Sequence, residues 1–169
     1  VLRLAASVWG RPDEKKPDAA MGTWDATKVW VERAGAVLHD LPLILDDTKR
    51  AKSPEIVAEV LYLVASGRGR GRGNPRSLSR IGTWRTILIS SGEAKAISFT
   101  QDGGTRARTL EITVPPFGAE DPAAGQLVDE VNAEVMLHYG HAGPLVVQHL
   151  LRHRAEWPKL QQAYTELVR

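Results

Sequence analysis

Residues 41–47 read LPLILDD, and this stretch decides the fold class. A short apolar run without alternation, bounded by polar residues, is typical of a strand covered on both faces, as in parallel sheets. Two acids, Asp46 and Asp47, follow the run directly. Ligands of open parallel sheets bind beyond the carboxyl ends of the strands. The stretch therefore predicts a buried central strand that ends in a ligand site.

The segments around this strand alternate between the patterns of helices and of strands. Strands are predicted at residues 23–27, 84–90 and 110–114, and helices at residues 1–9, 28–39 and 54–66. This order predicts an α/β core over residues 1–117, with a mostly parallel sheet and helices on both sides. From Asp121 onward the pattern is purely helical, so residues 118–169 are predicted to form a helical subdomain.

Composition limits the class of protein. The chain has 169 residues, of which 43% are hydrophobic and 25% charged, the ordinary mixture of one folded domain. It contains no cysteine, which excludes disulfide scaffolds, thiolate nucleophiles and cysteine-bound metal clusters. No apolar run approaches the roughly 20 residues that cross a bilayer. We therefore expect no membrane partner and a cytoplasmic location.

Polar residues after two neighbouring strands form the candidate site. Asp46 is assigned to hold magnesium through a water, and Asp47 to orient an attacking water. The next strand ends in ISSGE, which places Ser90 or Ser91 to sense a terminal phosphate and Glu93 to add a charge. Two ordinary explanations stay open: the acids cap the turn to the next helix, and the serine–glycine run is a simple turn.

Successive blocks of the sequence resemble a known family. The blocks are RLAASVWG, GTWDAT, LPLILDD, ASGRGRGRG, TWRTILISSGE, GGTRARTLEITVP and HYGHAGPLVVQHLL. In order and spacing they resemble the bacterial and phage domain-of-unknown-function family 927. The resemblance implies a P-loop ATPase core, helicase-like and found in phages and integrated mobile elements, with ATP and Mg²⁺ as cofactors.

The resemblance also implies where the phosphate-binding loop lies. Val1 would come just after that loop, and no G-x-x-x-x-G-K-[ST] motif occurs in the chain. We therefore expect a fragment without its Walker A loop, inactive by itself. Walker B strands of such ATPases end in Asp-Glu, whereas this strand ends in Asp46 and Asp47. Glu93 therefore competes with Asp47 for the role of base.

Arg106 and Arg108 come just before the last predicted strand. By resemblance to ring ATPases, one of the two would act in trans, beside the triphosphate of a neighbouring subunit in a homo-oligomer. Taken without the family, both are explained as solvated charges at a strand entrance.

The segment at residues 68–80 is glycine-rich and basic. Arg68, Arg70 and Arg72 alternate with glycine, and arginines neutralise nucleic-acid phosphates without reading bases. The segment is either a solvated flexible loop or a contact to nucleic acid.

Three functions are compatible with these patterns. The first is an ATP-hydrolysing, helicase-like domain that acts on DNA, single-stranded DNA included, in phage or mobile-element replication. The second is a nucleic-acid-binding module with a P-loop-like fold and no hydrolysis. The third is a purely structural interaction domain.

Overall fold

A three-stranded parallel sheet lies at the centre of the computed structural model, which describes residues 1–73, 80–100, 102–118 and 121–168. Its strands are β1 (Gly22–Thr23), β2 (Leu43–Asp46) and β3 (Leu88–Ser90), in the order β1-β2-β3. Thr23 lies opposite Asp46, and Leu45 lies opposite Ser90. The carboxyl ends of the three strands therefore meet at one edge of the sheet.

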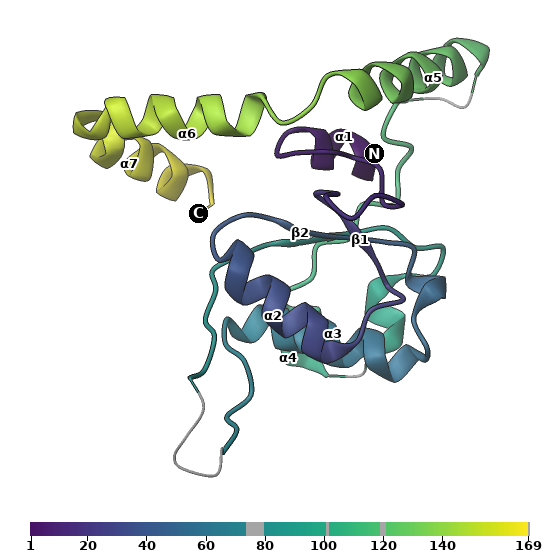
Figure 1. Cartoon of the computed structure of the whole chain (residues 1–169), viewed down its shortest axis with the longest axis vertical. Helices are drawn as coiled ribbons and strands as arrows, with labels where there is room; N and C mark the ends of the chain where they lie inside the picture. Colours follow the sequence, from purple (N-terminus) through teal and green to yellow (C-terminus); the bar gives the residue numbers. More distant parts are fainter. Residues whose placement is uncertain (74–79, 101, 119–120, 169) are drawn as a thin grey trace.

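Helices cover both faces of this sheet (Figure 1). Leu43 and Leu45 belong to the core formed with α2 and α3, whereas Ile44 packs with Leu2 and Ala6 of α1. The predicted strand with two covered faces is thus confirmed, and so is the α/β class. The helices are α1 (Leu2–Ser7) on one face, and α2 (Lys28–Leu38) and α3 (Pro54–Ser66) on the other.

From Pro122 onward the described chain is helical, as the sequence pattern after Asp121 predicts. Helix α5 packs against α1, where Val135 is buried, and the amides of Gly140 and Gly143 donate to the carbonyls of Ser7 and Val8. No helix in the described part of the chain is long and apolar enough to cross a membrane. The remaining elements are η1 (Thr48–Arg50), η2 (Ala96–Phe99), α4 (Gly103–Arg106), α5 (Pro122–Leu137), α6 (Ala142–Arg152), η3 (Arg154–Glu156) and α7 (Trp157–Leu167).

The strand predicted at residues 110–114 is wrong. Leu110, Ile112 and Val114 are 87%, 75% and 68% exposed, and this segment pairs with no strand among the described residues. A strand forms where a neighbour offers backbone donors and acceptors, and alternation of apolar residues does not supply that neighbour. The continuous apolar run at residues 87–89 predicts a second central strand, but β3 pairs only with β2 and lies at the edge of the described sheet, because residues 110–114 do not pair with it.

The buried face of α2 also differs from the predicted one. The apolar pattern of residues 28–39 predicts one buried face made of Trp30, Ala34, Val37 and Leu38, but Trp30 and Val37 are 46% and 83% exposed. Val31, Glu32 and Gly35 are buried instead. The Trp84 ring packs so close to Gly35 that an added Cβ would lie 3.1 Å from it. Trp84, which is far from α2 in the sequence, therefore packs on the Gly35 side of α2, and this side is the buried one.

Candidate functional site

Asp46 and Ser91 form the centre of the candidate site. Asp46 is the last residue of β2, and the Ser91 hydroxyl, just past β3, donates a hydrogen bond of 2.6 Å to its Oδ1. Among the described residues, no group donates a hydrogen bond to Asp46 Oδ2. Parallel pairing of β2 with β3 brings the two residues together across 45 positions of sequence.

Trp24, directly after β1, makes hydrogen bonds to the ends of both β2 and β3. Its backbone amide donates to the carbonyl of Asp46 at 3.1 Å, and its indole Nε1 donates to the Ser90 hydroxyl at 2.7 Å. The indole is 2% exposed, as expected for a core tryptophan whose N–H has a partner. Ser90 is thus held by Trp24, the residue after β1, and Ser91 is held by Asp46 of β2, and both predicted serines line the same pocket as Asp46.

Asp47 has a different role from Asp46. Its backbone adopts φ 59° and ψ 94°, and its Oδ1 accepts the amide of Lys49 at 3.0 Å, which caps the short helix η1. Its own amide donates to the Ser91 hydroxyl at 3.1 Å. A non-glycine residue with positive φ is uncommon and is held only by such surrounding bonds. Turn capping, the ordinary explanation for the acid pair, therefore describes Asp47.

Glu93 lies three residues after the end of β3 and faces solvent. Its side chain is 75% exposed and pairs with Lys49. Gly92, between Glu93 and Ser91, passes so close to the Thr48 side chain that an added Cβ would collide with it. The glycine of ISSGE is therefore required by the close approach of the β3 end to η1.

A pocket of about 420 Å³ opens where Asp46 is located. It is lined by Asp46, Ser90 and Ser91, and the start of α1 contributes Val1 and Arg3. Asn132 of α5 also lines it, a residue that the sequence reasoning missed. Asn132 is one helical turn from the buried Val135. The sequence signal that could have identified Asn132 is its position on the same, inward face of α5.

The donors in this pocket fit a magnesium ion bound to phosphates. Mg²⁺ prefers oxygen ligands and is held by one or two carboxylates together with substrate phosphates and water. Asp46 supplies the carboxylate, and Ser90 and Ser91 supply hydroxyls at the same edge. No group of three or more acidic or histidine side chains gathers for a metal among the described residues, so phosphate and water oxygens would have to complete the coordination there.

Arg106 and Arg108 lie apart from the pocket that contains Asp46. Arg106 ends α4, which packs against α3, and Arg108 Nη1 donates to the Gly104 carbonyl at 2.8 Å. Hydrogen bonds from the Thr105 hydroxyl and the Gly104 amide lower the pKa of Asp102, the residue that caps α4. Both arginine side chains are exposed, and neither lines that pocket.

The described part of the basic segment makes specific contacts with the rest of the protein. Arg68 forms an isolated antiparallel bridge with Thr83, and Arg72 pairs with the buried Glu32 of α2. Arg68 and Arg70 are exposed. Residues 74–79 of this segment lie outside the described residues. Arg72 is also exposed, with 48% of its side chain accessible, but its ion pair joins this part of the segment to the buried Glu32.

A parallel sheet between helices, with a carboxylate and hydroxyls at the carboxyl edge of its strands, defines an α/β protein of the P-loop-like class. Residues 1–84 match the sequence profile of the family described as "Domain of unknown function (DUF927)", and this part of the chain belongs to that family. The resemblance predicted from the sequence blocks is confirmed over these residues.

A solved structure titled "SCCmec type IV Cch - active helicase" is similar to this chain, with a TM-score of 0.63 and 27% sequence identity. The similarity covers 91% of this chain and 26% of that one, so the chain spans about a quarter of that protein's length. A comparison with curated proteins gave no match.

Proposed function

We propose that this chain is part of an ATP-hydrolysing, helicase-like domain that acts on DNA in a phage or mobile element. The observation that carries the proposal is the Asp46–Ser91 pair at the carboxyl edge of the sheet, in a pocket where α1 begins. The similarity to a structure titled as a helicase supports the same class of activity.

In this proposal Asp46 holds the magnesium ion, and Ser90 or Ser91 contacts the terminal phosphate. A magnesium ion there would neutralise phosphate charge as the terminal phosphoryl group leaves. Ser91 holds the Asp46 carboxylate in one orientation, and Asp47 or Glu93 orients the attacking water. Because the chain contains no glycine–lysine phosphate loop, the proposal requires that this loop be supplied from outside residues 1–169.

The proposal extends to partners. DNA would contact the basic segment around Arg68 and Arg70, since exposed arginines between glycines can follow a phosphate backbone. Arg106 or Arg108, exposed and remote from the protein's own Asp46, would act on the nucleotide of a neighbouring copy in a homo-oligomer.

The test is ATP hydrolysis by the full-length protein and its Asp46→Ala variant. We expect the variant to lose turnover roughly 100-fold or more, because removing the carboxylate removes a contact worth several kcal/mol at the transferring phosphate. Asp129→Ala, which removes an exposed acid on α5, is the matched control and should keep wild-type turnover. Normal turnover by a folded Asp46→Ala protein would contradict the proposal.

A second function is favoured by one observation. Asp47 caps η1 and Glu93 pairs with Lys49, so neither lines the pocket with Asp46. A nucleic-acid-binding module without hydrolysis would have this arrangement. Salt-sensitive DNA binding by a full-length wild-type protein that does not turn over ATP would select this second function.

A further inference from the structure

The two ends of the basic segment, at residues 67–69 and 82–84, run antiparallel and are joined by backbone hydrogen bonds. We call this part the base of the segment. Helix α3 ends at Gly67, whose φ of 69° turns the chain out of the helix. Beyond it the Gly69 amide donates to the Gly82 carbonyl at 2.8 Å, and the Trp84 amide donates to the Gly67 carbonyl at 2.9 Å. These bonds hold the two arms of the segment side by side where they leave the body of the protein (Figure 1).

A buried carboxylate fixes one arm further along. Glu32 of α2 is 8% exposed, and its two oxygens accept both terminal nitrogens of Arg72 at 2.9 and 2.8 Å. Gly69 lies against the same carboxylate, where an added Cβ would stand 2.9 Å from Glu32 Cδ. A charge that is buried needs a partner with good geometry, and the two-pronged arginine contact supplies it.

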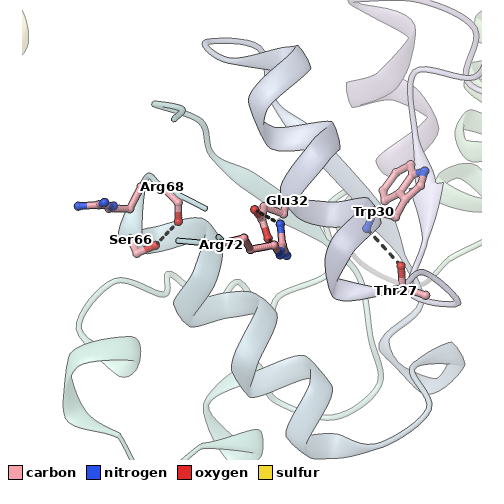
Figure 2. A network of polar contacts seen from close by, with 6 residues as sticks. All are labelled: Thr27, Trp30, Glu32, Ser66, Arg68 and Arg72. Carbon is pink, nitrogen blue, oxygen red and sulfur yellow. Dashed lines mark hydrogen bonds and ion pairs between the residues drawn. The ribbon is translucent and has the colours of Figure 1, made fainter. Parts of the chain in front are cut away.

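This contact divides the arginines into two groups. The charge of Arg72 is neutralised by Glu32 and its side chain turns toward α2, whereas the Arg68 side chain points away from the helices (Figure 2). Arg70 is exposed as well, and the nearby acid Glu59 is already paired with Lys28. Arg72 is 48% exposed and differs from Arg68 and Arg70 in its pairing with Glu32. On the arm at residues 68–72, Arg68 and Arg70 therefore carry the charge that is offered to a polyanion.

We propose that Glu32 is a positioning residue that anchors Arg72, so that the base of the segment presents Arg68 and Arg70 to nucleic-acid phosphates. Arg72 then serves as an anchor and makes no phosphate contact itself. The proposal rests on the proposed action on DNA and assigns separate roles to arginines that look equivalent in the sequence.

The salt dependence of DNA binding separates an anchor from a phosphate contact. With the full-length protein and a labelled single-stranded oligonucleotide of mixed sequence, Arg70→Ala should reduce the slope of log affinity against log salt by about 0.7, the value for one phosphate lost on a single strand. Arg72→Gln should weaken binding and leave the slope unchanged. A slope reduced equally by Arg72→Gln would overturn the anchor role.

A charge exchange tests Glu32 directly. Glu32→Gln should weaken binding by about threefold to tenfold with an unchanged slope, because the anchor is loosened and no phosphate contact is removed. The double variant E32R/R72E should bind more tightly than R72E alone, since it restores the pair with its charges reversed. If Arg72 touched phosphate, the double variant would bind as weakly as R72E.

Hydrogen exchange distinguishes a failure of the Glu32–Arg72 anchor from a failure of DNA as the partner. The Gly69 amide should lose protection in Glu32→Gln, while amides of β2 keep theirs; retained protection at Gly69 overturns the anchor. A wild-type protein that shows no salt-dependent binding overturns the DNA partner and with it the proposed function, whatever the exchange at Gly69.

Discussion

Ser91 joins the ends of β2 and β3 through three hydrogen bonds. Its hydroxyl donates to Asp46 and accepts the amide of Asp47, and its carbonyl accepts the amide of Thr48. A single side chain therefore fixes the orientation of the candidate metal-binding acid and the positive φ of its neighbour. This division of Asp46 from Asp47 could not be predicted from two adjacent identical residues, because it depends on a serine 44 positions away from Asp47.

Replacing Ser91 should show the cost of this connection. Ser91→Ala removes a hydrogen bond to a carboxylate and leaves the Asp47 amide without its acceptor, so we expect a loss of about 1.5–3 kcal/mol in the free energy of unfolding. Urea denaturation measures it. Ser98→Ala, which removes an exposed hydroxyl that donates to the nearby Lys95 carbonyl, is the control and should cost less. Equal losses for the two variants would contradict the proposed bridging role.

At the scale of elements, local signals placed α3 accurately. Pro54 at the first helical turn and Gly67 beyond the last one predict both ends, and the helix runs between them. The Ser53 side chain, however, makes no capping hydrogen bond. The pattern at residues 110–114 predicted a strand that did not form, because pairing needs a neighbour that no local pattern describes.

Gly67 provides a test at this scale. Gly67→Ala places a Cβ on a residue with φ 69° and 3.0 Å from the Trp84 carbonyl, so it should cost about 1–2 kcal/mol of stability. Gly125→Ala, near the start of α5 with open space around it, should instead be neutral or stabilising by up to about 1 kcal/mol. Thermal or urea unfolding compares them, and a Gly67→Ala protein as stable as wild type would be the contrary result.

At the scale of the whole molecule, the C-terminal helices are attached over a small area. The contacts include the packing of α5 on α1, the hydrogen bonds from Gly140 and Gly143 to the end of α1, at 2.7 and 2.9 Å, and the Arg11 guanidinium over the Tyr139 ring. Beyond them, apolar side chains of α6 and α7 stay exposed, with Leu145 at 62% and Leu167 at 85%. We propose that residues 118–169 form a subdomain that is joined to residues 1–117 mainly through α1.

Gly143 is the close contact of this junction. A Cβ there would lie 2.6 Å from Cζ3 of the Trp9 ring, so Gly143→Ala should force the two apart and destabilise the attachment of α6 by about 1–3 kcal/mol. Hydrogen exchange should then accelerate in α6 while β2 amides stay protected. Val146→Ala, on the same helix at a side chain that is 57% exposed, is the control. Unchanged exchange in Gly143→Ala would refute this attachment.

The sequence by itself determined the buried parallel strand β2, the helical segments and the polar residues at one edge of the sheet, because each follows from residues within a few positions of one another. Only the tertiary structure decided that Asp46 faces the pocket while Asp47 caps a turn, and that residues 110–114 stay unpaired. It also decided that Glu32 is buried, since its partner Arg72 lies 40 positions away. Such pairings depend on which distant groups meet, and a local pattern contains no information about that meeting.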